Sequence, residues 1–115
     1  AFRNVGQPII IPGSMGSDSY ILRGGAASLD LTFGSTAHGA GRILSRTKAK
    51  KLFKASEIQA KLKEQNIYVT ATLDATISEE APGVYKDVSE VVNISDSLGI
   101  GDKVARTYPV VNIKG

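Results

Sequence analysis

The sequence contains no cysteine and only one histidine, His38, among its 115 residues. Without cysteine the chain can form no disulfide bond, no thiolate zinc site and no cysteine nucleophile. A single histidine excludes a multi-histidine metal site, so any metal would need carboxylates or ligands from other chain segments. Long apolar runs are missing as well. The run at residues 9–11, which no other apolar run exceeds, is closed by Pro12, whereas a membrane span needs roughly 18 residues.

The composition is typical of one folded domain. Hydrophobic residues make up 42% of the chain and charged residues 22%, which excludes the disordered, collagenous and coiled-coil classes. A chain of this length forms one domain and not two. Residues 1–3 show neither an initiator methionine nor a signal peptide, so we expect the chain to begin inside a longer protein. We also expect a cytoplasmic location, since the missing cysteines give no argument for secretion.

Charge is segregated along the chain, although the net charge is only +3. Residues 42–54 carry six basic side chains and no acidic one, whereas residues 65–102 carry seven acidic side chains and one basic side chain, Lys86. A basic block beside a polar loop favours a phosphate-bearing partner. The alternative is a solvated helix face that binds no ligand.

The hydrophobic periodicity predicts an α+β fold, with a mixed or antiparallel sheet and about three helices. Strands are expected at residues 7–12, 20–22, 26–33 and 67–73, and a last strand at 104–113 is expected to bend at Pro109. Helices are expected at residues 42–55, 56–65 and 87–98. Ser56 and Gln59 have capping-box spacing for the second helix, while Asp87 and Gly99 are the expected cap and stop of the third.

His38 is the first candidate for chemistry, because it stands among small residues in the glycine-rich stretch 34–41. A ligand can approach such a loop across its glycines, and a neutral imidazole is a competent nucleophile toward phosphorus. The alternative is an exposed loop histidine without a function. Gly39, Ala40 and Gly41 run into the first expected helix and could offer backbone N–H groups to an anion, or form a plain turn. Their spacing does not match a P-loop.

Arg42 and Arg46 are four residues apart, which predicts that they share one face of the expected helix and can both bind phosphate. Simple solvation is the alternative for both arginines. Three serines, Ser14, Ser17 and Ser19, either bind a base edge or satisfy their own turn. Tyr85 is either a core aromatic residue or a stacking platform for a base. Glu79 and Glu80 are expected to be exposed charge.

Five blocks carry a family resemblance. They are residues 12–16 (PGSMG), 35–42 (STAHGAGR) with Ser45 and Arg46, 79–87 (EEAPGVYKD), 104–106 (VAR) and the final Lys114-Gly115. In this order they resemble the C-terminal portion of RtcB, the family of GTP-dependent RNA-splicing ligases. Members of this family join 2′,3′-cyclic-phosphate or 3′-phosphate RNA ends to 5′-hydroxyl ends. Residues 1–115 are therefore expected to be the C-terminal segment of a longer ligase, part of a larger fold.

The resemblance implies a role for each matching residue. His38 would be the histidine that accepts GMP from GTP, with Gly39, Ala40 and Gly41 lining the nucleotide. The residues that would surround the guanine are Ser14, Ser19, Tyr85 and Lys114. The family usually has cysteine before this histidine, and here the residue is Ala37, which removes a thiol but leaves the nucleophile. The family's manganese ligands lie upstream of this segment, so this chain alone is expected to be inactive.

The leading hypothesis is an RNA ligase acting in tRNA splicing and RNA repair. GTP would form GMP-His38, the GMP would activate an RNA 3′-phosphate as RNA-ppG, and a 5′-hydroxyl would displace GMP. The expected partners are RNA, as tRNA exon halves or broken ends, the rest of the ligase chain and an activating protein, with no membrane. One alternative is a non-catalytic nucleotide or RNA binding module. Another is a structural domain in which His38 is dispensable.

Overall fold

The computed structural model describes residues 2–115. Ala1, one of the three residues on which the expected internal start rests, lies outside the described residues. The expected α+β class is confirmed, because helices accompany an antiparallel sheet and a small parallel sheet. The chain forms two compact units. Unit 1 comprises Ala1–Gly13, Asp18–Ala40 and Asp87–Thr107, and unit 2 comprises Ser14–Ser17, Gly41–Lys86 and Tyr108–Gly115.

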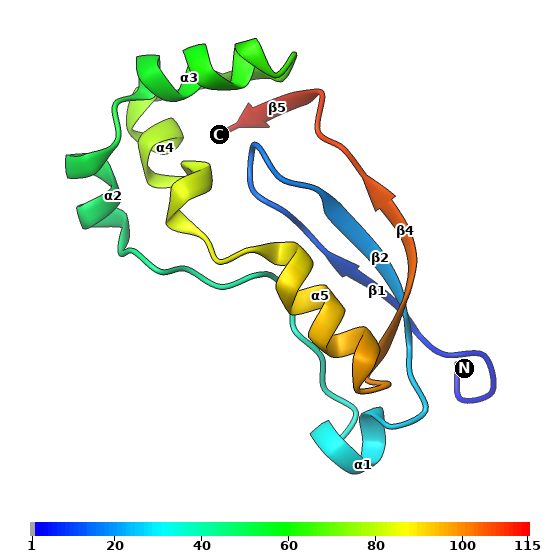
Figure 1. Ribbon diagram of the computed structural model, residues 1–115. Helices are drawn as coiled ribbons and strands as arrows, with labels where there is room; N and C mark the ends of the chain where they lie inside the picture. Colours follow the sequence, from blue (N-terminus) through cyan, green and yellow to red (C-terminus); the bar gives the residue numbers. More distant parts are fainter. Residues whose placement is uncertain (1) are drawn as a thin grey trace. The chain divides into compact units, whose positions relative to one another are not determined.

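Unit 1 is built on an antiparallel sheet of three strands in the order β1-β2-β4 (Figure 1). The strands are β1 (Pro8–Ile11), β2 (Ser19–Gly24) and β4 (Gly101–Thr107). Prolines at positions 8 and 12 limit β1 to four residues, since proline cannot donate a ladder hydrogen bond. The predicted strands at 7–12 and 20–22 are therefore confirmed. Ile11, Tyr20 and Leu22 point into the core of unit 1.

Helix α5 (Val88–Ser97) covers this sheet by burying Val88 and Val92 in the same core. The two valines are four residues apart and so lie on one helix face. The Asp87 side chain accepts the Ser89 N–H at 2.8 Å, which confirms the expected cap. At the other end Gly99 adopts φ +70°, as the expected stop requires. The predicted helix at 87–98 is thus confirmed to within one residue at each end.

Unit 2 packs helices against a pair of parallel strands. Its elements are α2 (Arg46–Leu52), α3 (Ala55–Glu64), β3 (Tyr68–Ala71), α4 (Asp74–Glu79), a 3-10 turn η1 (Pro82–Val84) and β5 (Val111–Lys114). β3 pairs with β5 in register, Tyr68 opposite Val111 and Ala71 opposite Lys114. The core contains Met15, Ile58, Leu62, Ile67, Ile77 and Val84 among its buried side chains. Met15 is fixed there because its carbonyl accepts the Asn112 amide at 2.9 Å.

Two of the expected strands, at residues 26–33 and 104–113, are wrong. Residues 26–33 form no strand but contain the short helix α1 (Ser28–Thr32), whose N–H groups bond within the helix, as from Phe33 to Leu29. The alternation of Leu29, Leu31 and Phe33 does not reflect a strand, because all three side chains are exposed and pack on no sheet. The terminal strand is not one bent strand: it divides into β4 and β5, which belong to different sheets. Helix α4 was not expected at all.

Helices α2 and α3 begin at other residues than the sequence predicts. Helix α2 starts at Arg46 and not at residue 42, because Ser45 caps it by accepting the Lys48 N–H at 3.2 Å. Helix α3 starts at Ala55 with Lys54 as its N-cap and no side-chain cap bond, so the capping box at Ser56 does not form. Its end agrees with expectation, since Asn66 adopts φ +59°. Among residues 2–115, no helix has the length and apolar character that crossing a membrane requires.

Candidate functional site

His38 lies on an exposed bend of unit 1 that is anchored on both sides. Ala37 and Ala40 pack against the core formed by the sheet and α5, whereas the His38 side chain is exposed between them. Small side chains at both anchors let the backbone lie close to the core. The loop therefore presents its imidazole to solvent from a backbone that packs on the core on both sides of His38.

Gly39 and Gly41 leave open space around the loop. A Cβ atom added to either glycine would meet no atom within 4 Å, so a ligand could approach the backbone at both positions. Gly41 adopts φ +81°, which side chains rarely tolerate. The loop does not run directly into a helix, because residues 42–45 separate it from the first residue of α2. The expectation that Gly39, Ala40 and Gly41 run into a helix N-terminus is therefore wrong, while anion binding by their backbone N–H groups stays a prediction.

The predicted serines satisfy polar groups of their own turn. Ser14 Oγ lies 2.9 Å from Ser17 Oγ, and Ser17 Oγ accepts the Ser14 N–H at 2.7 Å. Ser19, the first residue of β2, accepts the Gly13 N–H at 3.0 Å. Each hydroxyl retains the capacity for a further hydrogen bond. Lys114 stands at the end of β5, where its carbonyl accepts the Thr72 N–H at 3.1 Å.

Arg42 and Tyr85 are placed beside one another by backbone pairing within unit 2. The two residues form an antiparallel bridge. It is closed by the Ile43 N–H donating to the Val84 carbonyl at 2.8 Å and the Lys86 N–H donating to the Gly41 carbonyl at 3.0 Å. Arg42 consequently precedes helix α2, and the expected common helix face for Arg42 and Arg46 is wrong. The pairing instead brings the guanidinium over the Tyr85 ring, 5.1 Å from its centroid.

Four of the five N–H bonds of the Arg42 guanidinium have partners in unit 2. Nε donates to the Leu44 carbonyl at 3.1 Å, and Nη2 donates to the Glu79 carbonyl at 2.7 Å. Nη1 donates to Glu80 Oε1 at 3.2 Å and to the Tyr85 hydroxyl at 3.0 Å. The Tyr85 hydroxyl in turn donates to the other oxygen of Glu80. Arg42 is thus held in one place, and its fifth N–H has no partner among residues 2–115.

Glu79 connects this cluster to helix α2. Lys50 Nζ donates to Glu79 Oε1 at 2.9 Å, and Arg46 Nε lies 3.7 Å from Glu79 Oε2. The hydrogen bond from Lys50 lowers the pKa of Glu79 below its ordinary value of 4.5, against the opposing effect of burial. Glu79 and Glu80 are thus paired, with side chains 23% and 22% exposed. The expectation that both are exposed charge is wrong.

The environment of Tyr85 favours its protonated form. Burial raises the pKa of Tyr85 above its ordinary value of 10.0, and the hydrogen bond to Glu80 raises it further, while Arg42 acts in the opposite direction. Tyr85 also packs against the core of unit 2. The phenol is therefore a neutral donor held by its neighbours, with a ring that serves as a wall of the cluster.

The predicted residues divide between the units. His38, Gly39, Ala40 and Ser19 belong to unit 1, whereas Ser14, Gly41, Arg42, Arg46, Tyr85 and Lys114 belong to unit 2. Within unit 2 the structure brings Arg42 and Tyr85 into contact and places Arg46 beside their partners Glu79 and Glu80. Sequence reasoning missed the role of the two glutamates. A usable signal was present, since Glu80 and Tyr85 flank the turn-forming residues 81–84.

Carboxylate and imidazole side chains are the donors that this chain could offer to a metal ion. No group of three histidine, cysteine, aspartate or glutamate side chains within residues 2–115 is arranged to hold a metal ion. The manganese that the family resemblance implies thus does not fit this part of the chain. Its ligands would have to come from elsewhere.

The comparison with known proteins covers the whole chain. Residues 1–115 match the family model described as tRNA-splicing ligase RtcB. The chain is 53% identical over 114 residues to the tRNA-splicing ligase RtcB of Nanoarchaeum equitans and 48% identical over 112 residues to that of Methanococcus maripaludis. It is 47% identical over 114 residues to that of Pyrococcus horikoshii. These alignments cover 99%, 97% and 99% of this chain, but only 24%, 23% and 13% of the three relatives.

Proposed function

Because the chain belongs to the tRNA-splicing ligase RtcB family, we propose that it is the C-terminal segment of a GTP-dependent RNA ligase. The observation that carries this proposal is the exposed His38 on a loop anchored by Ala37 and Ala40. The relatives are named as tRNA-splicing ligases, so RNA ends produced in tRNA splicing are the proposed substrate, with RNA repair as a second use. The proposed site of action is the cytoplasm.

In the first step an unprotonated ring nitrogen of His38 attacks the α-phosphorus of GTP. A nitrogen–phosphorus bond forms, the bond to the pyrophosphate oxygen breaks, and pyrophosphate leaves while the ring proton passes to solvent. The open surroundings of Gly39 support this step, because a Cβ atom added there would meet no atom within 4 Å. We retain Ala40, Ser14, Ser19, Tyr85 and Lys114 as nucleotide contacts on the strength of the family resemblance alone.

In the later steps the RNA 3′-phosphate displaces His38 from GMP, giving RNA-ppG, and a 5′-hydroxyl then displaces GMP to form the new phosphodiester. Phosphoryl transfer depends on positioning and charge neutralisation more than on acid-base groups. Arg46 is the principal candidate for an RNA phosphate, since its side chain is 70% exposed. Arg42 contributes one remaining N–H and chiefly positions Tyr85 and Glu80.

Manganese would be supplied by ligands outside this chain, and it would neutralise charge on the transferred phosphate. We therefore propose that residues 1–115 alone do not join RNA. The partners in this proposal are the RNA ends, the rest of the ligase chain and an activating protein.

The test is to incubate the full-length ligase with GTP and manganese and then to search peptides by mass analysis for GMP. A GMP adduct on the peptide containing His38 supports the ligase. A protein that binds GTP or RNA without forming any adduct would instead be the non-catalytic binding module. Adduct formation on another residue would remove His38 from its proposed role.

A further inference from the structure

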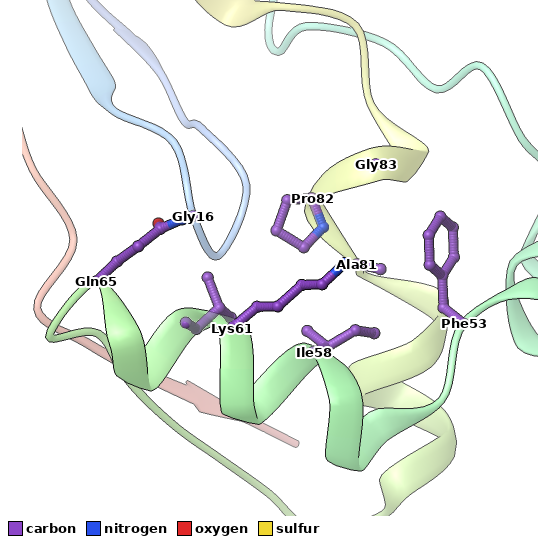
Figure 2. Close-up of a pocket in the computed structure, with 9 residues that line it drawn as sticks. Gly16, Phe53, Ile58, Lys61, Gln65, Ala81, Pro82 and Gly83 are labelled. Atoms are coloured by element: carbon purple, nitrogen blue, oxygen red, sulfur yellow. The ribbon is translucent and has the colours of Figure 1, made fainter.

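A pocket of about 270 Å³ opens in unit 2, within that unit alone (Figure 2). Its floor is apolar and comes from the core side chains Ile58, Leu62 and Ala81. Its rim carries two polar side chains, Lys61 and Gln65. None of the predicted nucleotide contacts lines it. An apolar floor with a few convergent polar groups is the usual composition of a ligand pocket.

One face of helix α3 forms the polar side of this pocket. Ile58, Lys61, Leu62 and Gln65 follow the spacing of one helix face. The two apolar members are buried and the two polar members are exposed. Figure 2 shows the Lys61 side chain extended across the pocket toward Ala81 and Pro82. Lys61 forms no ion pair with any residue in the described part of the chain, so its charge is available to a ligand.

On the opposite side of the pocket, the backbone of two glycines lies close to neighbouring side chains. A Cβ atom on Gly16 would lie 2.9 Å from Leu62 Cδ2 and 3.1 Å from Pro82 Cγ. A Cβ atom on Gly83 would lie 3.0 Å from Cζ of Phe53, so the Phe53 ring lies against the backbone of η1. The half-buried Phe53 ring therefore forms a fixed aromatic end wall.

The lysine in the pocket and the net charge of unit 2 indicate the class of its ligand. Unit 2 carries ten basic and five acidic side chains, whereas unit 1 carries four basic and six acidic ones. The excess positive charge of the chain is thus concentrated in the unit that contains the pocket. An aromatic wall beside a lysine in a basic region is how proteins bind single-stranded nucleic acid, which offers a flat base and a phosphate. The volume lies below the roughly 300–1,000 Å³ of pockets that enclose drug-sized molecules, as suits a single base.

We propose that this pocket binds one unpaired nucleotide of the RNA substrate, with the base against Phe53 and the apolar floor and its phosphate at the Lys61 ammonium. This inference rests on the proposed function, because it takes its ligand from the RNA that the ligase joins. It adds to the ligase a contact that holds a single-stranded RNA end.

The test measures RNA affinity of the full-length ligase, without GTP, over a range of salt concentrations. The probes are a single-stranded RNA oligonucleotide ending in a 3′-phosphate and a fully paired RNA duplex. Phe53→Leu removes the aromatic ring but stays apolar, and we expect it to weaken single-strand binding at least fivefold, since the base loses the aromatic face on which it stacks. Lys61→Met keeps the stem and removes the charge, and we expect it to lower the salt slope by about one.

Lys63→Ala is the matched control, because Lys63 lies on the same helix and does not line the pocket. We expect it to retain the single-strand affinity that Phe53→Leu loses, and we expect duplex binding to be the same in all three variants. Photo-crosslinking with 5-iodouridine in the single strand should label the peptide containing Phe53. Equal single-strand affinity of Phe53→Leu and wild type, or crosslinks confined to other peptides, would overturn the proposal.

The wild-type GMP adduct on His38 is measured in parallel. If no adduct forms but Phe53→Leu still loses single-strand affinity, the proposed ligase reaction fails and the pocket stands. If the adduct forms and the pocket variants bind RNA like wild type, the pocket fails and the reaction stands.

Discussion

Arg42 lies over the ring of Tyr85 and also donates a hydrogen bond to its hydroxyl, at 5.1 Å from the ring centroid and 3.0 Å from the oxygen respectively. A cation above an aromatic face is attracted by the ring quadrupole. Here the same guanidinium is additionally bound to Glu80 and to two backbone carbonyls. Arg42 is therefore a structural clamp of unit 2 that joins the segment before α2 to the segment after α4.

The clamp predicts a large effect on stability. Arg42→Ala should lower the free energy of unfolding by roughly 2–3 kcal/mol, because it leaves Glu80 and the carbonyls without their charged donor. Urea unfolding of the chain measures this loss. The control is Lys54→Ala in the same unit, whose ion pair with Glu57 is exposed, at 79% and 64%, and should contribute at most about 1 kcal/mol. Equal losses in the two variants would refute the clamp.

Glu79 predicts a dependence of stability on acid pH. Because Lys50 lowers the pKa of Glu79 in the folded state, the pair stabilises the fold above the ordinary value of 4.5, and this stabilisation disappears as pH falls through the lowered pKa. Lys50→Gln should therefore be less stable than wild type at neutral pH, with the difference shrinking in acid. Urea midpoints at a series of pH values measure it. A difference that stays constant with pH would contradict the pairing.

The raised pKa of Tyr85 predicts a dependence of stability on alkaline pH. Its pKa is raised, by burial first and by Glu80 next, so its contribution to stability is complete below 10.0 and is lost as pH rises through the raised value. Glu80→Gln should lower the pKa of Tyr85, and Arg42→Gln should raise it. Titration of the assigned Tyr85 ring carbon by NMR measures both. Shifts of the same sign in the two variants would be inconsistent with this cluster.

The local chemistry of the chain was enough to predict some elements. The cap at Asp87, the stop at Gly99 and the valines between them are all near in sequence, so the helix they specify is confirmed as α5. The short run closed by Pro8 and Pro12 is likewise confirmed as β1. Such signals act within a few residues and need no knowledge of the tertiary fold.

Elements that depend on distant partners could not be predicted in this way. The segment before α2 is not helical because residues 41–43 pair with residues 84–86. No local sequence pattern predicts that pairing. Leu29, Leu31 and Phe33 alternate like a strand but have no neighbouring strand, so the segment satisfies its backbone as a helix. His38 could be selected as a candidate residue from its glycine-rich surroundings. The hydrogen bonds from Arg42 to Glu79 and Glu80, in contrast, depend on the tertiary structure.

Gly39 offers a test that separates folding from nucleotide binding. Its backbone is not in the left-handed region, and an added Cβ would meet no atom within 4 Å. Gly39→Ala should therefore change the free energy of unfolding by less than about 0.5 kcal/mol, yet impair GMP adduct formation by the full-length ligase if Gly39 lines the nucleotide. Gly16→Ala is the contrasting variant, because its Cβ would lie 2.9 Å from Leu62, and it should destabilise the fold by about 1–3 kcal/mol. Unimpaired adduct formation in Gly39→Ala would remove Gly39 from the nucleotide site.

His38→Ala gives the most direct test of the proposed reaction. The side chain is exposed and its anchors Ala37 and Ala40 are untouched, so the variant should fold like wild type. In the full-length ligase it should form no GMP adduct and should not join RNA ends with GTP. Denaturation curves alongside the joining assay establish that any loss is chemical.

Supplying pre-activated RNA-ppG to His38→Ala then isolates the step that needs the imidazole. If His38 is only the nucleophile that receives GMP, joining to a 5′-hydroxyl should return, because the activated phosphate no longer depends on a covalent enzyme intermediate. A dispensable loop histidine would leave both adduct formation and joining unchanged in the variant. A folded variant that still fails to join RNA-ppG would place His38 in the final transfer as well, since bypassing the first step would then not have bypassed its role.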